Sequence, residues 1–444
     1  MENHLPIHRR DFLIASSTLA ASAAVTDTAL HASATTTGSE LAIHGGPKAL
    51  KSPVPKFARW GDPERRRLES MIGQDTLFYW RGPQTTALIE RFQKICPTKY
   101  VMTCSSGTAA LHIAVASSGL KPGDEVITSP ITDIGTVIGA VYQQAVPVFA
   151  DLIPNTYNLD PADVERKITP KTKAIIAVHL GGNPCDMERL RAIADKHQLV
   201  LIEDCAQAWG TLYRGKPIGT LGHIACFSLQ QSKQVTCGDG GVVASNDDRF
   251  GPLLQRFGDK GFDRLGTSGL FESFAPNYRM SEPQAAVAAA QLDRVEEIAS
   301  KRSSAGNLLN EKLRGIHGIE PHHVDADDRC TYWLSMFRIQ PSRFRCNRAE
   351  FVKALVAEGV AASAGYIPVP LYGNPVFQQH GFFGGHWPVK EFGLTSMDYS
   401  KVKCAEAESI LNSGIRLVVN EAMMEDYILG AAEAVKKVAT HFAI

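Results

Sequence analysis

The segment Phe227-Ser228-Leu229-Gln230-Gln231-Ser232-Lys233-Gln234-Val235-Thr236-Cys237-Gly238-Asp239-Gly240-Gly241 joins two apolar runs through one lysine and a glycine-rich turn. The runs at 224–229 and 242–245 are short and apolar, which predicts two buried strands. Lys233 then follows the end of the first strand. Burying an amine costs free energy unless it is neutralised or bonded, although most lysines are exposed. Lys233 is therefore either a surface residue of a hairpin loop or a group with a chemical role.

Strands and helices alternate in the residues before this segment. Regular alternation predicts an α/β fold with a mostly parallel, doubly wound sheet, whose ligands bind at the carboxyl ends of the strands. The predicted strands are 101–103, 125–128, 146–150, 174–179 and 200–203, and the predicted helices between them are 108–118, 134–143, 160–167 and 186–197.

The pattern changes after Ser281. Residues 283–312 predict one long helix, and residues 368–385 an irregular loop rich in Pro, Gly and aromatic residues. Further strands are predicted at 332–339 and 360–365, and helices at 348–358, 404–412 and 424–442. We therefore predict four parts: a signal at 1–34, an arm at 35–61, a large domain at 62–295 and a smaller α+β C-terminal domain at 296–444.

Composition excludes several classes of function. The 444 residues contain 46 basic and 46 acidic side chains with no basic run, so no nucleic-acid partner is indicated. No apolar run approaches the roughly 20 residues of a membrane-spanning helix, so stable membrane insertion is not expected. The nine cysteines include no CxxC pair, so neither a metal site nor a redox motif is predicted.

The amino terminus has the pattern of an export signal. His8-Arg9-Arg10-Asp11-Phe12-Leu13-Ile14 opens an apolar stretch rich in small residues, and Ala32-Ser33-Ala34 offers a cleavage site. The arginine pair resembles the twin-arginine type, which carries folded proteins and suits an enzyme that loads a cofactor before export. This pattern predicts an exported or periplasmic protein. The alternative is a tail with a chance arginine pair and a cytoplasmic protein.

The first of three motifs that accompany Lys233 is Cys104-Ser105-Ser106-Gly107-Thr108-Ala109-Ala110-Leu111. A predicted strand ends here, a turn of small residues follows, and a helix begins. The free amides and the dipole of the helix favour an anion, so a phosphate would bind the amides of Gly107 and Thr108 and the Thr108 hydroxyl. The same residues are also typical of an ordinary helix cap.

The second motif is Leu201-Ile202-Glu203-Asp204-Cys205-Ala206-Gln207-Ala208-Trp209-Gly210, an apolar strand with an acid at its end. A carboxylate there can keep the ring nitrogen of pyridoxal phosphate protonated, and we assign this role to Asp204. Alternation along the strand turns Glu203 to the opposite face. Gln207 would bond the ring hydroxyl, and Lys233 would form an imine with the aldehyde. The alternative for Asp204 is a helix N-cap.

The third motif, Ala275-Pro276-Asn277-Tyr278-Arg279-Met280, is a polar loop before the long helix that would reach a phosphate, either in its own subunit or in a neighbouring one. With these motifs in this order, the chain resembles sugar aminotransferases of the DegT/DnrJ/EryC1/StrS family, in the fold type I group of pyridoxal-phosphate enzymes. The resemblance covers roughly residues 40–440. The matching segments are 106–111, 122–127, 147–151, 178–180, 203–208, 227–229 with Lys233, 238–241 and 277–280.

The resemblance implies a role for each matching residue. Lys233 is similar to the lysine that forms the internal aldimine and moves the proton, and Asp204 to the partner of the ring nitrogen. The other cofactor-binding residues would be Gly107, Thr108, Gln207, Ser228 and Asn277. Asn277 matches a residue that reaches the phosphate across a dimer interface, so a homodimer with shared active sites is implied.

Two positions depart from the family pattern. Asp133, in Thr132-Asp133-Ile134-Gly135-Thr136, stands where many relatives have an aromatic residue that stacks on the cofactor ring. Trp209 replaces a frequent histidine and is a candidate for the missing aromatic. Cys205 and Cys237 flank the motifs, and we expect both to be small, buried residues of the core. A structural role is also expected for His179.

The function expected from this pattern is an aminotransferase with pyridoxal 5'-phosphate. Glutamate or glutamine would donate the amine, and a keto sugar or keto-cyclitol would accept it. If the signal is used, a free keto sugar or keto-inositol is more plausible than a nucleotide-linked sugar, and the loop from Tyr366 to Tyr372 resembles that of relatives acting on inosose-type ketones. The alternatives are a sugar dehydratase, in which His commonly replaces the lysine, and a non-catalytic binding or regulatory protein.

Overall fold

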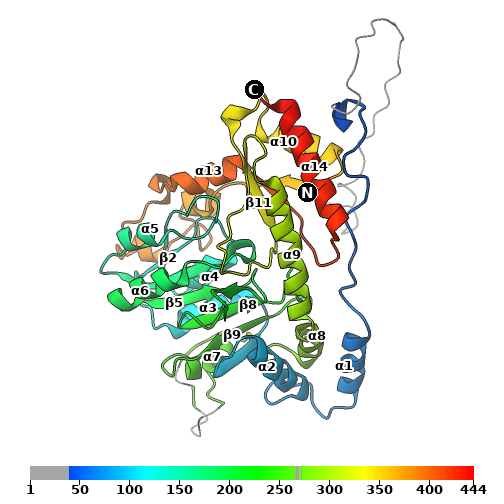
Figure 1. Ribbon diagram of the computed structural model, residues 1–444. Coiled ribbons are helices and arrows are strands. Elements are labelled where there is room, and N and C mark those ends of the chain that lie inside the picture. Colours follow the sequence, from blue (N-terminus) through cyan, green and yellow to red (C-terminus); the bar gives the residue numbers. More distant parts are fainter. Residues whose placement is uncertain (1–39, 265, 267–269, 272) are drawn as a thin grey trace, which may run out of the picture. The chain divides into compact units, whose positions relative to one another are not determined.

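The computed structural model describes residues 40–264, 266, 270–271 and 273–444 (Figure 1). These residues belong to one compact unit. The predicted signal at 1–34 and the first residues of the predicted arm lie outside the described residues. Among the helices that are described, none combines the length and the apolar character that a membrane span requires.

A seven-stranded sheet organises the first half of the chain. Its strand order is β1-β9-β8-β5-β4-β2-β3; the strands from β8 to β3 run parallel, and β9 runs antiparallel to both β1 and β8. The predicted mostly parallel α/β fold is therefore confirmed. The strands are β1 (Tyr100–Cys104), β2 (Glu125–Thr128), β3 (Val146–Phe149), β4 (Thr172–Val178), β5 (Val200–Asp204), β8 (Ile224–Ser228) and β9 (Gly241–Ser245).

Helices connect these strands, as the alternation predicts. They are α3 (Gly107–Ser117), α4 (Gly135–Tyr142), α5 (Pro161–Arg166) and α6 (Met187–His197); α7 (Gly251–Gly258) follows the last strand, β9, and the hairpin of β6 (Leu212–Tyr213) and β7 (Lys216–Pro217) precedes β8. Helix α3 packs on β8 and β9, and α6 packs on β4 and β5. Helix α3 therefore begins beside the carboxyl end of β8. Polar side chains from three elements can meet there.

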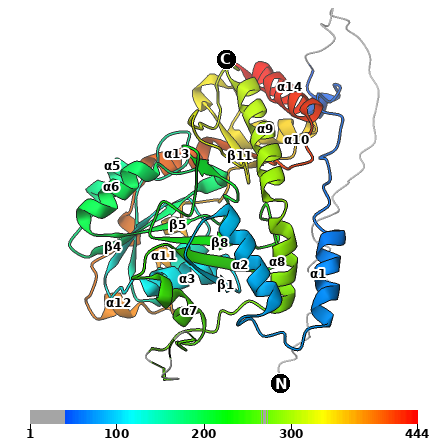
Figure 2. The ribbon, with the colours of Figure 1, turned by 60° about the horizontal axis from the view of Figure 1, so that its bottom comes forward.

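The predicted long helix at 283–312 is in fact two helices, α8 (Glu282–Leu292) and α9 (Val295–Leu313). Arg294, with φ −109° and ψ 1°, leaves the helical conformation between them. Its guanidinium donates to the carbonyl oxygen of Arg59 at 2.8 Å, so it bonds the arm. Helix α8 packs on α1 (Asp62–Ile72) and α2 (Pro83–Ile95), whereas α9 packs on the C-terminal helix α14 (Glu425–Phe442) (Figure 2). The break redirects the chain from one sheet to the other.

The second sheet has four antiparallel strands in the order β10-β11-β13-β12. They are β10 (Ile319–Glu320), β11 (Ser335–Ile339), β12 (Ala362–Ala364) and β13 (Gly414–Leu417), and α10 (Arg348–Ala357) packs beside β12. The strand expected at 332–339 begins only at Ser335. Strand β13 follows the predicted helix at 404–412, observed as α13 (Ala405–Ser413), and was not predicted.

Two hydrophobic clusters form the core. The first surrounds the seven-stranded sheet and also includes buried side chains from Leu371 to Leu411, a stretch that contains α11 (Pro375–Gln378) and α12 (Pro388–Glu391). The second lies among the four-stranded sheet, α9, α10 and α14. Residues 371–411 thus pack with the sheet that precedes them by over a hundred residues. The boundary at 295 and 296 stays a prediction.

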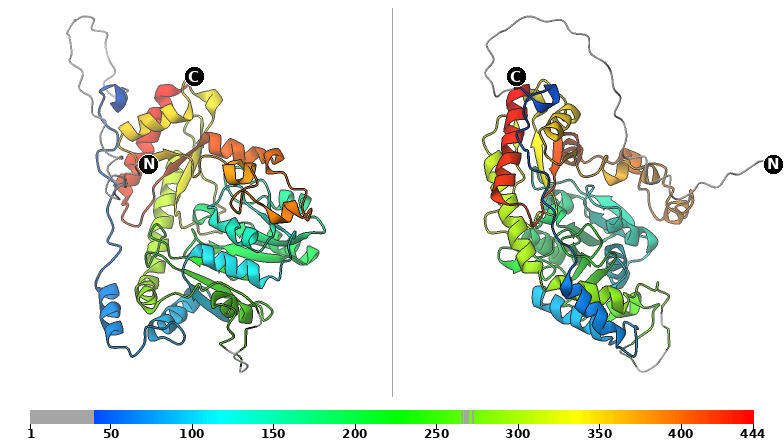
Figure 3. Two further views of the ribbon diagram at one scale, coloured as in Figure 1. Left: turned by 180° about the vertical axis from the view of Figure 1, so that it is seen from behind. Right: turned by 90° about the vertical axis from the view of Figure 1, so that its right-hand side faces the viewer.

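The arm crosses from the second cluster to the first (Figure 3). Leu50 donates its amide to the Glu358 carbonyl, and Asn420 binds the carbonyl of Pro55. Further along, Arg59 Nη1 donates to the carbonyl oxygen of Lys233 at 2.9 Å. The arm is therefore held by hydrogen bonds along its length and ends beside the lysine of interest.

Candidate active site

A cavity of about 370 Å³ opens at the carboxyl ends of β5 and β8. Asp204 ends β5, Ser228 ends β8, and α3 begins with Gly107. All predicted site residues except Asn277 line it: Gly107, Thr108, Asp204, Gln207, Ser228 and Lys233. Segments separated by more than a hundred residues therefore place a lysine, a carboxylate and a helix amino terminus around one space.

Lys233 is half-buried at the cavity wall. Its Nζ lies 4.3 Å from the centre of the Trp333 ring, and its carbonyl binds Arg59. Burial lowers the pKa of Lys233, and the negative charges of Asp204 and Asp133 oppose that shift in part. A lowered pKa increases the fraction of neutral, nucleophilic amine at a given pH. The surface-lysine interpretation does not account for this environment.

Asp204 is 4% exposed and faces the cavity. Its Oδ2 accepts a hydrogen bond from Thr136 Oγ1 at 2.8 Å, and its Oδ1 accepts one from the Ala206 amide at 3.1 Å. Burial raises the pKa of Asp204, while these hydrogen bonds and the charge of Lys233 act in the opposite direction. Among the described residues no cation bonds this buried carboxylate, which is therefore suited to a positively charged group of a ligand.

Glu203 points to the opposite face of β5, as strand alternation predicts. It is fully buried, and its carboxylate accepts hydrogen bonds from three backbone amides, those of Gly219, Leu221 and Gly222. It also lies 3.3 Å from His179 Nε2, whose ring accepts the Cys185 amide at Nδ1. The expected structural role of His179 is confirmed by these contacts.

Replacing Glu203 with glutamine is expected to lower the free energy of unfolding by about 3 kcal/mol or more, because the amide nitrogen would face buried N–H donors and leave them unsatisfied. Denaturant titration measures this change. Glu69→Gln, at an exposed position on α1, is the matched control and should change stability little. A Glu203→Gln protein as stable as the parent would contradict the structural role.

The amino terminus of α3 forms an anion cradle with β8. The amides of Gly107 and Thr108 have no hydrogen-bond acceptor among the described residues, whereas the next two amides bind Ser106. The Ser228 hydroxyl accepts a weak hydrogen bond from Gln230 at 3.3 Å, and its own proton has no acceptor in the described part of the chain. A Cβ on Gly107 would lie 2.7 Å from Ser228 Cβ, so glycine permits this close approach. The cap and phosphate interpretations are compatible, because Ser106 is the cap.

Gln207 is held so that its amide group turns a donor toward the cavity. Its Oε1 accepts the Gly181 amide at 2.8 Å, and its Nε2 donates to the Tyr366 hydroxyl at 3.1 Å. Tyr366 and Trp333 both line the cavity, and their rings pack edge to face. These two aromatic side chains, from segments far along the chain, close one side of the cavity.

Trp209 is not the substitute aromatic suggested from the sequence. It is 1% exposed and packs in the core against Phe92 and Phe227, while its Nε1 donates to the Ser228 carbonyl. It does not line the cavity. Asp133 does line the cavity and is exposed, so its position beside the ligand space is as expected but its side chain cannot stack.

Asn277 is exposed and lies outside the cavity lining of its own chain. Its Oδ1 accepts a hydrogen bond from Arg279 Nε at 2.8 Å. Of the flanking cysteines, Cys205 is fully buried as expected, whereas Cys237 is only half-buried. The role expected for Asn277 depends on a second subunit and stays a prediction.

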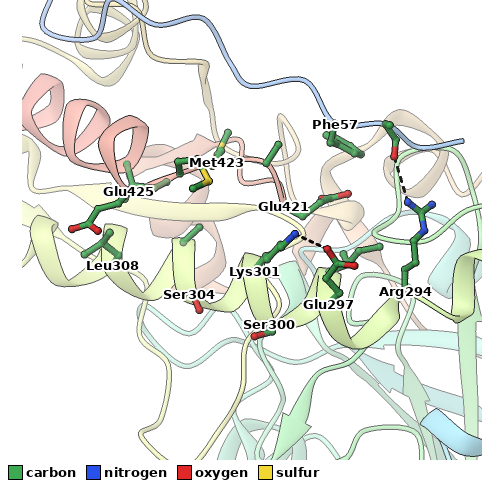
Figure 4. Close-up of a pocket in the computed structure, with 16 residues that line it drawn as sticks. Phe57, Arg294, Glu297, Ser300, Lys301, Ser304, Leu308, Glu421, Met423 and Glu425 are labelled. Atoms are coloured by element: carbon green, nitrogen blue, oxygen red, sulfur yellow. Dashed lines mark hydrogen bonds and ion pairs between the residues drawn. The ribbon is translucent and has the colours of Figure 1, made fainter. Parts of the chain in front are cut away.

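A larger cavity of about 690 Å³ lies elsewhere, between the arm, α9 and the segment before α14. Figure 4 shows the ion pair of Glu297 with Lys301 on α9 and the bond from Arg294 to the arm. None of the predicted site residues lines it. The cavity at Lys233 is therefore the candidate active site because of the residues that line it, although the other cavity is larger.

Comparison with known proteins agrees with this geometry. Residues 62–390 match the model of the DegT/DnrJ/EryC1/StrS aminotransferase family. The chain belongs to this family. It is therefore an aminotransferase by family, and the family is dependent on pyridoxal phosphate.

Individual relatives within the DegT/DnrJ/EryC1/StrS family act on sugars and cyclitols. GDP-perosamine synthase of Caulobacter vibrioides is 35% identical over 324 residues, which are 71% of this chain and 86% of the relative. A putative L-glutamine:3-amino-2,3-dideoxy-scyllo-inosose aminotransferase of Streptoalloteichus tenebrarius is 34% identical over 350 residues, 76% of this chain and 83% of the relative. The structure of DesI with its TDP-sugar product has a TM-score of 0.74 and 27% identity, covering 90% of this chain and 97% of DesI.

The residues missed by sequence reasoning come mainly from outside the recognised motifs. Thr136 binds Asp204, and Trp333 contacts Lys233, but neither was assigned a role from the sequence. Arg59 reaches Lys233 from the arm. Tyr366 was noted only as part of a loop. Thr136 belongs to the segment Thr132–Thr136 that was already compared with the family, which was a signal that could have been used, whereas Trp333 gave none.

Proposed function

We propose that this chain binds pyridoxal phosphate at the Lys233 cavity and transfers an amino group from glutamate or glutamine to a keto sugar or keto-cyclitol. The observation that carries the proposal is the convergence of Lys233, the buried carboxylate of Asp204 and the α3 cradle on one cavity. When bound, pyridoxal phosphate supplies a ring that stabilises negative charge on the carbon carrying the transferred amine.

The residues present fit this cofactor. The two unused amides and two hydroxyls of the cradle suit a phosphate dianion, and Gly107 lets α3 approach Ser228 closely enough for both to contact one anion. Asp204 would pair with a protonated ring nitrogen, and the Gln207 donor would bind the ring oxygen. Lys233 supplies the amine for covalent attachment and, when free, holds or moves a proton at its Nζ. Trp333 and Tyr366 limit water on one side.

Replacing Ser228 with alanine is expected to weaken pyridoxal-phosphate binding by roughly 10- to 100-fold, because a hydrogen bond to a charged group is lost. Equilibrium dialysis of the apo protein with the cofactor measures this change. Ser300→Ala, in the larger cavity of Figure 4, is the matched control and should leave affinity unaltered. Equal affinities for Ser228→Ala and the parent would remove Ser228 from the phosphate site.

The reaction is tested in two steps. Glutamate or glutamine added to the loaded protein should shift the absorbance of the cofactor to that of its amine form, and a keto substrate should reverse the shift. No shift with any amino donor would count against an aminotransferase, and a protein that never takes up the cofactor would leave only a non-catalytic role. The intact Lys233 disfavours the dehydratase alternative.

The acceptor we propose carries no phosphate. The lining contains three carboxylates, those of Asp133, Asp204 and Asp239, and Lys233 is its one cation among the described residues. Such a lining favours a neutral or amine-bearing acceptor over a nucleotide diphosphate. A keto-cyclitol and a GDP-linked keto sugar, offered in parallel to the amine-loaded protein, distinguish the two classes. Faster turnover of the GDP-linked ketone would overturn this assignment.

We also propose a homodimer in which Asn277 completes the site of the partner. Large apolar side chains near Asn277 are exposed, including Phe271, Phe274 and Phe78, and an exposed apolar patch is typical of an interface. Light scattering is expected to give twice the mass of the 48.2 kDa chain. A monomer that retains full cofactor affinity would contradict the proposal.

A complementation experiment tests the shared site directly. Lys233→Ala lacks the reactive amine, and Asn277→Ala is expected to bind the phosphate weakly. In a mixed dimer, one site combines Lys233 of one subunit with Asn277 of the other and should recover activity at limiting cofactor. Failure of mixed dimers to recover any activity would place Asn277 outside the neighbouring site.

The last part of the proposal is that the protein is exported before it acts on its substrate. It rests on the twin-arginine pattern at 8–14 and on the acceptor argument above, because nucleotide sugars are made in the cytoplasm. Fractionation of cells that make the full chain, with mass spectrometry of its amino terminus, tests it. An uncleaved protein found only in the cytoplasm would refute export.

A further inference from the structure

Arg416 is a cation beside the candidate active site for which the described part of the chain offers no bonded partner. It lies on β13, opposite Met336 of β11 and Ser363 of β12. Residues directly opposite in a sheet share a face. Met336 belongs to the core around the seven-stranded sheet, whereas the alternate residues Ile415 and Leu417 belong to the second core. Arg416 therefore projects from the side of the small sheet that faces the large one.

Two cavity residues mark the place of its guanidinium. The Arg416 Cζ lies 5.6 Å from the centre of the Trp333 ring, the ring that also contacts Lys233 Nζ. Its positive charge also acts on the hydroxyl of Tyr366, which lines the same cavity. Arg416 is not part of the cavity lining, and it thus lies next to the aromatic wall that Trp333 and Tyr366 form.

Arg416 is half-buried, and one donor of its guanidinium is unsatisfied. Its Nε is buried without a hydrogen-bond partner, and no carboxylate forms an ion pair with it among the described residues. Arg338, on the same face of the sheet, is instead bonded to Glu406 and to two serines. A buried arginine donor without an acceptor costs free energy, and its planar fork matches a carboxylate. The contrast with Arg338 indicates that the acceptor for Arg416 arrives with a ligand.

We infer that Arg416 binds the α-carboxylate of the amino donor, with the Trp333 side chain yielding space as the donor enters. The inference rests on the proposed function. A free α-amino acid carries this carboxylate on the carbon next to the reacting nitrogen, so it must lie within a few bonds of Lys233. Arg416 is a binding residue for one substrate and takes no part in proton transfer. A carboxylate on an acidic keto sugar is the other source of the same chemistry.

Two changes distinguish the amino donor from an acidic keto sugar as the source of the carboxylate. One removes the charge of Arg416, and the other removes the α-carboxylate of the donor. We compare Arg416→Gln with the parent, using glutamate, glutamine and isoglutamine, the α-amide of glutamate, and following the cofactor band in single turnover. The apparent affinity for glutamate and glutamine should fall by roughly 10- to 150-fold, the effect of losing a charge-assisted hydrogen bond, while that for isoglutamine stays the same. Arg416→Lys, which keeps the charge, should recover part of the loss.

A binding measurement independent of turnover completes the test. Glutarate, which carries carboxylates but no amine, should bind the loaded parent protein in calorimetry and bind Arg416→Gln more weakly. Cofactor absorbance and melting temperature of the variant serve as checks of folding.

Three results would overturn the inference. One is an unchanged affinity for all donors, another is a loss shared by glutamate and isoglutamine but not glutamine, and the third is a loss confined to a keto-uronic acid acceptor. A parent protein that accepts amine from no donor would instead reject the proposed function itself.

Discussion

Replacing Lys233 with alanine is expected to lower the aminotransferase rate by on the order of 10³-fold or more, because one amine serves both as nucleophile and as proton carrier. Among the residues that the structure describes, Lys233 is the one lysine in the cavity lining, so no neighbouring amine can replace it. The steady-state rate with glutamate and an acceptor ketone measures the loss. The cofactor band of the parent should disappear on borohydride treatment, and mass spectrometry should locate the added mass on the peptide containing Lys233.

Two further variants separate charge from chemistry. Lys233→Arg keeps a cation beside Asp204 and Trp333 but cannot form the covalent link, so its rate should resemble that of Lys233→Ala. Lys216→Ala removes an exposed lysine on β7 and should behave as the parent does. A Lys233→Ala protein that kept the band and a tenth of the rate would show that another group carries the chemistry.

The same lysine gives a pH dependence with a definite sign. Burial lowers the pKa of Lys233, so the neutral amine accumulates as pH rises through a value below the 10.5 of an unperturbed lysine. Attachment of the cofactor to the apo protein should therefore speed up with pH and level off before that value is reached. Stopped-flow absorbance from pH 6 to 10 measures the profile, and a midpoint at or above that of free lysine would contradict the buried environment.

Much of the site could be predicted because its parts are local. Each strand end carries its polar residue within a few positions of an apolar run, and parallel strands bring those ends to one edge. Alternation along β5 was enough to assign Asp204 to the cavity and Glu203 to the opposite face, as observed. The amino terminus of α3 likewise follows β1 after a two-residue turn. Such features depend on short stretches of sequence, which is why they were found.

The rest depends on contacts between distant segments. Trp333 lines the cavity from just before β11, and Arg416 on β13 lies beside its ring, but nothing in the sequence around either residue indicates these positions. Trp209 looked available for stacking because its motif adjoins Asp204, but the turn after β5 carries its ring into the core against Phe92 and Phe227. The break near Arg294 is also non-local, since the Arg294 side chain binds the arm.

Replacing Asp204 with asparagine is expected to change activity and stability in opposite directions. Asparagine has nearly the same shape and can keep both bonds, because its Oδ1 can accept from the Ala206 amide and its Nδ2 can donate to Thr136 Oγ1. The Thr136 hydroxyl can then turn to donate to Thr132 Oγ1, 2.7 Å away. What is lost is the negative charge that would hold the ring nitrogen protonated. The rate should fall by about 10²- to 10³-fold, the cost of removing one preorganised electrostatic contact.

Stability of the apo protein should rise, and the sign follows from linkage. Burial raises the folded-state pKa of Asp204 above its value in the unfolded chain. The contribution of such a group to stability is fully present below the unfolded pKa and is lost as pH rises through the folded pKa. At neutral pH the apo parent therefore carries the cost of a buried charge that Asp204→Asn lacks, and the gap in melting temperature should shrink as pH falls toward the acid range.

The control and the cofactor separate this effect from general stabilisation. Asp248→Asn, at an exposed carboxylate that pairs with Lys99, should not raise the melting temperature at neutral pH. Adding pyridoxal phosphate should stabilise the parent more than Asp204→Asn, because only the parent offers a charge to the ring nitrogen. The difference in melting temperature between Asp204→Asn and the parent should therefore shrink or change sign when the cofactor binds. Asp204→Asn could instead be less stable than the parent without cofactor. The carboxylate would then stabilise the fold itself, and its position in the cavity would not be explained by a charge on a ligand.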